Sequence, residues 1–123
     1  MELITIEFKG KESIYEMASG NIVSRNKYYS DIVTDINGGT GTIRLYKRNG
    51  ICTMVVEVIP SEETGVTFTL PDAYIAIGAV FHQWEYKGQS NYVYFYANNT
   101  NVTIVHTGND EIADIITYMV SEI

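Results

Sequence analysis

The residues best suited to a binding role lie together in one stretch of the chain, between Phe81 and Tyr96. This stretch holds the single tryptophan, one of the two histidines and four of the ten tyrosines, namely His82, Trp84, Tyr86, Tyr92, Tyr94 and Tyr96. Sugars present flat patches of C–H groups that pack on aromatic rings, and their hydroxyls need polar partners. The stretch therefore predicts a sugar-binding surface, with hydrogen bonds supplied by His82, Gln83, Glu85 and Asp72.

The aromatic stretch reads as a β-hairpin whose loop spans residues 87–91. With that loop Tyr86 faces Tyr92, Trp84 faces Tyr94 and His82 faces Tyr96, and all six side chains share one face of the ribbon. A slip of one residue would move each assignment to the opposite face. Three interpretations stay open for this face, namely a sugar platform, a subunit interface and the hydrophobic core.

The sequence gives little support for catalysis. Its acidic residues, such as Glu62-Glu63 and Asp110-Glu111, read as solvated turns, and nothing in the pattern brings two of them together in a cleft. His82 and His106 lack metal-ligand spacing with Cys52, which reads as a small core residue. We therefore predict a non-enzymatic protein with no cofactor and no metal.

Charge and composition narrow the class of partner. The net charge is −7, and the eight basic residues are scattered along 123 residues, which argues against a nucleic-acid surface. The longest apolar run, AYIAIGAVF, is well short of the bilayer thickness, so no membrane insertion is expected. A single cysteine excludes an internal disulfide.

Many short alternating runs predict an all-β fold, an antiparallel β-sandwich or jelly-roll-like single domain over residues 1–123. The clearest local signal is Asn49-Gly50 between two such runs, the signature of a hairpin with a two-residue turn. That register places a set of apolar residues on one core-facing side, namely Ile43, Leu45, Cys52, Met54 and Val56.

Two segments are ambiguous between helix and strand. Residues 12–20 fit a short helix closed by Gly20 or an irregular strand. Residues 110–122 carry apolar residues at helical spacing after Asp110, which slightly favours a helix, but their β-branched content suits a closing strand.

Four pieces of the sequence, taken in order, resemble the C-terminal head domains of phage tail-fibre and baseplate receptor-binding proteins from phages of Gram-positive hosts. These pieces are GTIRLYKRNGICTMVVEV, FTLPDAY, NVTIVH and ITYMV. The resemblance covers roughly residues 41–120 and leaves the first forty residues unassigned. The sequence departs from the pattern after the Leu-Pro step, where Asp72-Ala73-Tyr74 is followed by Ile75 rather than a second proline.

The resemblance implies a β-sandwich or jelly-roll head that forms a homotrimer and binds host cell-surface polysaccharide or teichoic acid. It also implies a location in the virion, at the tail tip or fibre beside other tail and baseplate proteins, after synthesis in the bacterial cytoplasm. The leading hypothesis is therefore a receptor-binding module. The alternative is a structural tail or baseplate component that uses the aromatic hairpin face as a subunit interface.

Overall fold

The computed structural model describes residues 2–8, 11–18, 21–24, 28–61 and 65–121, with side chains from residue 28 onward. The first three strands are β1 (Glu2–Phe8), β2 (Lys11–Ala18) and β3 (Asn21–Ser24). They form an antiparallel sheet of their own in the order β1-β2-β3. The prediction of one domain over the whole chain stays a prediction, because residues 25–27, which join this sheet to the rest, lie outside the described residues.

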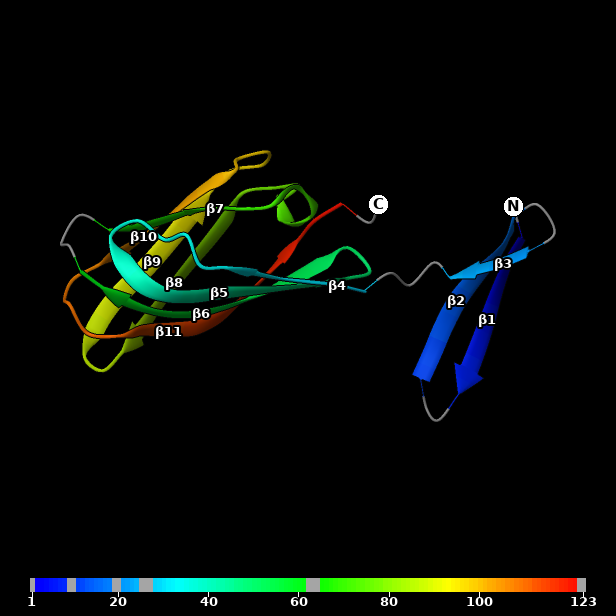
Figure 1. Ribbon diagram of the computed structural model, residues 1–123, viewed down its shortest axis with the longest axis horizontal. Helices are drawn as coiled ribbons and strands as arrows, with labels where there is room; N and C mark the ends of the chain where they lie inside the picture. The colour runs from blue at the N-terminus through cyan, green and yellow to red at the C-terminus, as the bar shows by residue number, and fades with distance from the viewer. Residues whose placement is uncertain (1, 9–10, 19–20, 25–27, 62–64, 122–123) are drawn as a thin grey trace.

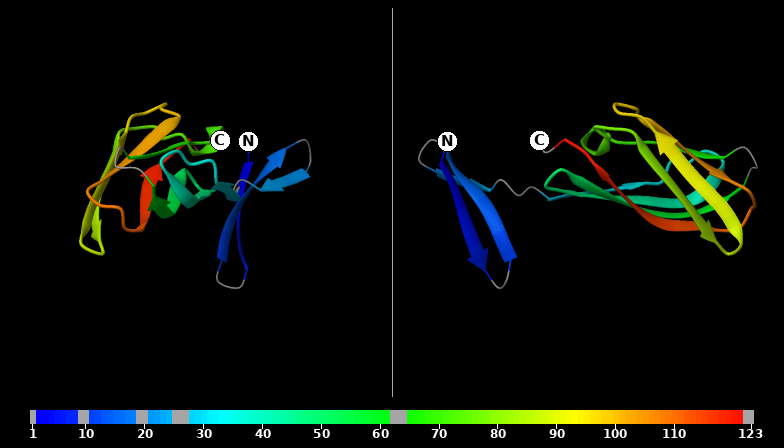
Figure 2. Two further views of the ribbon diagram at one scale, coloured as in Figure 1. Left: turned by 60° about the vertical axis from the view of Figure 1, so that its left-hand side comes forward. Right: turned by 180° about the vertical axis from the view of Figure 1, so that it is seen from behind.

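The remaining strands form a two-layered β-sandwich (Figure 1, Figure 2). One sheet, here the β5–β6 sheet, has the order β11-β6-β5-β4 and consists of β4 (Tyr28–Val33), β5 (Gly39–Arg48), β6 (Ile51–Pro60) and β11 (Ile112–Met119). The other, the β8–β9 sheet, has the order β7-β10-β9-β8 and consists of β7 (Val66–Thr69), β8 (Val80–Tyr86), β9 (Gln89–Phe95) and β10 (Asn101–His106). Every pairing is antiparallel, so the predicted all-β antiparallel sandwich is confirmed.

The β5–β6 hairpin has the predicted register. Asn49 and Gly50 adopt positive φ angles of 51° and 76°, as a type I′ turn requires, and Arg48 pairs with Ile51. The five residues expected on the core side, Ile43, Leu45, Cys52, Met54 and Val56, are all fully buried. This hairpin fixes the centre of its sheet and one wall of the core.

The opposite wall of the core comes from the β8–β9 sheet, where alternate residues are buried, including Val66, Phe68, Val93, Phe95, Val102 and Ile104. The Leu-Pro-Asp step ends β7 with Leu70 buried, and a 3₁₀ turn (η1, Asp72–Tyr74) follows directly. Tyr74 is also buried, and its carbonyl accepts a hydrogen bond of 2.7 Å from the Tyr118 hydroxyl on β11. The step therefore joins the two layers at one end of the sandwich.

Both ambiguous segments are strands where the structure describes them. Lys11–Ala18 is β2, while residues 19–20 lie outside the described residues. Ile112–Met119 is β11, which pairs with β6 along its whole length, so the helical interpretation of the C-terminal segment is wrong. The reason is that strand pairing buries Ile112, Ile116 and Tyr118 against the core, and this tertiary gain outweighs the helical spacing.

Candidate functional site

The loop of the β8–β9 hairpin begins at Lys87, as predicted, but has two residues rather than five. Lys87 and Gly88 form the turn with positive φ angles of 54° and 75°, so Tyr86 pairs with Gln89 and Trp84 with Asn91. The predicted loop over residues 87–91 is therefore wrong. In the predicted register each β8 residue faces a β9 residue three positions further along the chain than it does in the structure. Because successive side chains on a strand alternate between the two faces, this odd difference places the other alternate set of β9 side chains beside each set from β8.

The corrected register divides the predicted site between the two faces of the ribbon. His82, Trp84 and Tyr86 face inward and are each partly buried, beside the inward-facing Val93 and Phe95. The remaining tyrosines, Tyr92, Tyr94 and Tyr96, are exposed on the outer face of the sheet. The prediction that all six share one face is wrong.

The outer side also carries Phe81, which is not among the six residues predicted to share a face. Phe81 is 63% exposed and pairs with Tyr94 across the ladder, so it lies among the three outer tyrosines. We call Phe81, Tyr92, Tyr94 and Tyr96 the aromatic face. The Gly88 that permits a two-residue turn was the signal in the sequence that could have revealed this register.

The rings of the aromatic face hold one another in place. The Phe81 ring centroid lies 6.4 Å from that of Tyr92, in a stacked arrangement, and 6.1 Å from that of Tyr94, edge to face. The rings of Tyr94 and Tyr96 are 4.8 Å apart, also edge to face. Aromatic pairs at these separations are attractive, so the surface is organised before any ligand arrives.

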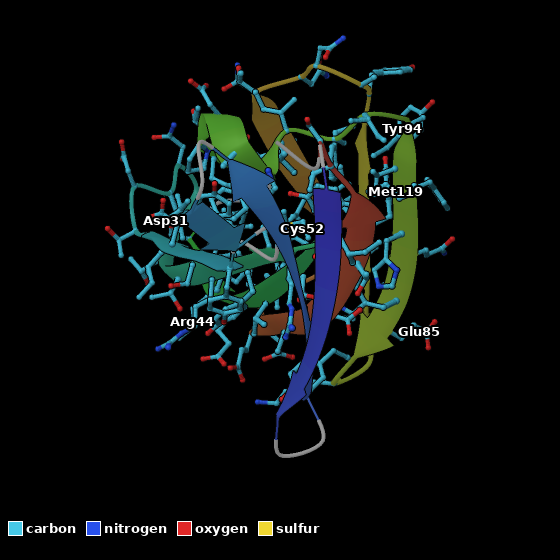
Figure 3. The ribbon with its side chains drawn as sticks, turned by 90° about the vertical axis from the view of Figure 1, so that its right-hand side faces the viewer. Asp31, Arg44, Cys52, Glu85, Tyr94 and Met119 are labelled. Atoms are coloured by element: carbon cyan, nitrogen blue, oxygen red, sulfur yellow. The ribbon has the colours of Figure 1, made fainter. Side chains whose placement is uncertain are left out.

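The hydroxyl of Tyr94 takes part in this arrangement. A hydrogen bond with Tyr96 is the main cause of the raised pKa of Tyr94. In Figure 3, Tyr94 and Glu85 both lie on the outer side of the hairpin, away from the interior of the sandwich. The face therefore offers apolar rings together with phenol hydroxyls.

A polar strip continues the outer face beyond the rings. Across β10 and β7, the hydroxyls of Thr67 and Thr103 lie 3.2 Å apart, and the Thr69 hydroxyl donates to the Asn101 side chain at 3.1 Å. All four residues belong to strands of the same sheet, since β10 lies between β9 and β7. Rings and hydrogen-bonding groups thus occupy one continuous surface, which is the combination that a sugar requires.

The inward-facing members of the predicted site have structural partners. His82 Nε2 lies 2.6 Å from Asp114 Oδ2 on β11 and links the edges of the two sheets. The Trp84 ring packs beside His82, 5.2 Å between centroids, and against the core, and its indole nitrogen is buried without a hydrogen-bond partner among the described residues. The Tyr86 ring lies 5.3 Å below the Lys87 ammonium. Asp72 is exposed in η1, after the edge strand β7, and so is not part of the hairpin.

A shallow hollow of about 340 Å³ lies where β8 begins and β11 ends. Its lining is mostly apolar and consists of Ile77, Gly78, Ala79, Val80, Phe81, Thr117, Tyr118 and Met119. Phe81 belongs to both this hollow and the aromatic face, so the two surfaces are continuous. The hollow has no charged side chain in its lining, which suits an apolar contact rather than an ionic ligand.

Over the described part of the chain, no group of three or more His, Cys, Asp or Glu side chains is placed to hold a metal ion. Nor do those residues include a helix long and apolar enough to cross a membrane. No protein family, curated protein or solved structure matches this chain.

Proposed function

We propose that this chain is a non-enzymatic glycan-binding module whose contact surface is the aromatic face. The observation that carries the proposal is the row of four exposed rings, Phe81, Tyr92, Tyr94 and Tyr96, on a rigid antiparallel ladder. Exposing a cluster of large rings to water is unfavourable in free energy, and such clusters mark interaction sites. Tyrosine gives each sugar ring an apolar surface and a hydroxyl in the same side chain.

The charge of this half of the molecule favours a neutral glycan over a polyanion. From Val66 to the C-terminus Lys87 is the only cation, against six carboxylates. The Lys87 ammonium is bound to Glu111 at 3.2 Å, and this hydrogen bond is the main cause of the raised pKa of Lys87. A phosphate-rich polymer such as teichoic acid would meet no available cation on the aromatic face, so we favour neutral cell-surface polysaccharide.

We further propose that the module belongs to a phage tail tip or fibre, where it recognises the surface of a bacterial host. This step rests on the resemblance of residues 41–120 to receptor-binding head domains, a range that covers strands β5 to β11. Placement in the virion, beside other tail and baseplate proteins, follows from the same resemblance.

The second candidate is a structural tail component that uses the same face as a subunit contact. The observation in its favour is the apolar hollow beside Phe81, which extends the aromatic face toward the exposed Met119. A subunit contact needs apolar area, whereas a sugar site needs hydroxyl and amide groups beside the rings. The polar strip of Thr67, Thr69, Asn101 and Thr103 favours the sugar site.

Titration of Tyr94→Ala with a soluble neutral oligosaccharide, first identified on a glycan array, tests the proposal. Loss of a central aromatic contact should weaken binding by about thirtyfold or more, which corresponds to a hot-spot residue. The melting temperature should fall by only a few degrees, because the Tyr94 ring packs on the Phe81 and Tyr96 rings but not in the core. Tyr28→Ala, a tyrosine exposed on the other sheet, is the matched control and should bind normally.

Two results would overturn the glycan proposal. One is an array without any binding by the folded wild type, and the other is normal affinity in both Tyr94→Ala and Phe81→Ala. A fall in the mass of the assembly on Tyr94→Ala, with the fold retained, would support the subunit contact instead.

A further inference from the structure

The outer face of the β5–β6 sheet is a second exposed apolar surface, on the side of the sandwich opposite the aromatic face. Large aliphatic, methionine and tyrosine side chains protrude from β4, β6 and β11 and are between 42% and 62% exposed, namely Tyr28, Ile32, Ile51, Ile59, Ile115 and Met119, while β5 contributes two exposed arginines. The register shows that they lie on one side, since Met119 pairs with Ile51 and Ile115 with Val55. We call this surface the aliphatic face.

The composition of the aliphatic face is typical of a protein–protein contact rather than a sugar site. Isoleucine and methionine offer no hydroxyl or amide to a sugar, while methionine, tyrosine and arginine are enriched in interfaces. Its cations are Arg44 and Arg48, both exposed on β5. In Figure 3, Arg44 points away from the sandwich on the side opposite Tyr94.

The area of the aliphatic face is close to what a stable contact needs. Four strands about 4.8 Å apart, with six to ten residues at about 3.3 Å each, cover roughly 500 to 600 Å² before the relief of the side chains is added. Specific protein interfaces bury about 800 Å² on each partner, and the smaller ones about 600 Å². With the relief of the side chains added, the face therefore matches the smaller of these interfaces.

The charges on this face are complementary to a second copy of the same face. Arg44 on β5 pairs with Val55 on β6, and Glu57 is the next residue along β6 on the same outer side. Both Arg44 and Glu57 are exposed, and neither forms an ion pair with another described residue. One positive and one negative group thus lie on neighbouring strands, one step apart.

We propose that the aliphatic face binds a second copy of this chain through a two-fold axis that runs along the strands between β5 and β6. This axis sets β5 of each copy against β6 of the other, so each Arg44 lies over Val55 and within reach of Glu57 of the second copy. Two such ion pairs flank the axis, and the isoleucines of the two copies pack against each other on either side of these pairs. The self-complementary pattern is what an isologous contact requires.

The outer rows of the face are compatible with this arrangement. Packed sheets are rotated by about 30° because each is twisted, so contacts are tightest near the axis and looser at the margins. Arg48 lies in the last row, beside the Asn49-Gly50 turn, where its guanidinium stays in water. The association leaves the aromatic face open, since that face belongs to the other sheet, and one dimer then presents two glycan surfaces.

Sedimentation equilibrium of the full chain and its variants at micromolar concentration tests the proposal. We expect the wild type to have twice the mass of one chain. Arg44→Glu and Glu57→Arg, each alone, place like charges across the axis and should give monomers. The double variant R44E/E57R restores opposite charges and should return the mass to that of a dimer.

Glu85→Arg, a charge reversal at an exposed position on the other sheet, is the matched control and should stay dimeric. Because Arg44 and Glu57 are exposed, the single variants should keep the wild-type circular dichroism, with a melting temperature lowered only by the loss of association. Ile115→Asn provides a second test that does not depend on charge and should also give a monomer.

A monomeric wild type would overturn the proposal, and so would a folded double variant that fails to reassociate. A trimer, which the family resemblance implies, would also overturn it. None of these outcomes bears on glycan binding by the aromatic face, which is measured with a monovalent sugar.

Discussion

Among the described glycines, Gly41 is the position where an added side chain would make the closest contact. Its φ angle is +140°, and a Cβ atom at this position would lie 2.1 Å from the carbonyl oxygen of Glu57, a backbone atom that cannot easily move. We expect Gly41→Ala to lower the free energy of unfolding by at least about 3 kcal/mol, because it combines backbone strain with a steric clash inside the β5–β6 ladder.

Gly88→Ala is the matched control for this prediction. Gly88 also has a positive φ, +75°, but a Cβ atom would meet nothing within 4 Å. The substitution therefore carries only the left-handed backbone penalty of about 1 kcal/mol. Urea denaturation of the two variants gives both values, and equal losses would contradict the clash at Gly41.

At the scale of single strands and hairpins, the β8–β9 turn should be easy to improve. Lys87 adopts a φ of 54°, a conformation that asparagine tolerates better, and Asn-Gly is the preferred pair for this turn. We expect Lys87→Asn to raise the melting temperature by a few degrees, even though it removes the exposed ion pair with Glu111. Glu111→Gln measures the loss of that pair alone. A melting temperature for Lys87→Asn no higher than that of the wild type would contradict the prediction.

The two hairpins explain how much of the fold and site the sequence revealed. Asn49-Gly50 marks its own turn, because both residue types are known for positive φ, and so the β5–β6 register followed correctly. Lysine is not typical of positive φ, so the position of the second turn within residues 87–91 was not evident from the sequence. The error placed Trp84 in the site and left out Phe81. Tyr92, Tyr94 and Tyr96 share one face in either register, since residues two apart on a strand always do.

Other features depend on contacts between elements far apart in the sequence. Nothing in residues 110–122 shows that β6 lies beside them, so their helical spacing favours a helix when the sequence is considered alone. Pairing with β6 makes the segment a strand. The contact between His82 and Asp114 joins residues 32 positions apart, across the two sheets. Pairings of this kind follow from the arrangement of the whole sandwich and have no local signature.

Across the whole molecule, stability should fall in alkaline solution. Burial is the main cause of the raised pKa values of Cys52, Tyr74 and Tyr118, which therefore lose protons less readily in the folded protein than in the unfolded chain. Unfolded thiols and phenols titrate near about 8.5 and 10. The unfolded state then binds fewer protons than the native state, so the free energy of unfolding decreases as the pH rises through this range.

We expect a constant melting temperature between about pH 7 and pH 8 and a progressive fall above about pH 9. Tyr118→Phe removes one of the three groups while keeping the ring edge to face with Phe95, at 5.2 Å in the wild type. Its melting temperature should start lower at neutral pH, because the hydrogen bond to the Tyr74 carbonyl is lost, and should then decline less steeply. A wild type equally stable at about pH 11 would show that these groups titrate alike in both states.

The full burial of Cys52 also gives the molecule a built-in probe of its own opening. This thiol is the only one in the chain and has no exposed surface, so a thiol reagent reaches it only when β6 separates from its neighbours. Under native conditions the rate of alkylation then reports how often the sandwich opens, and its dependence on denaturant shows whether the opening is local or global. A ligand that binds only the closed form should slow the reaction in proportion to its occupancy, so one unmodified side chain could report binding at a surface that it never touches.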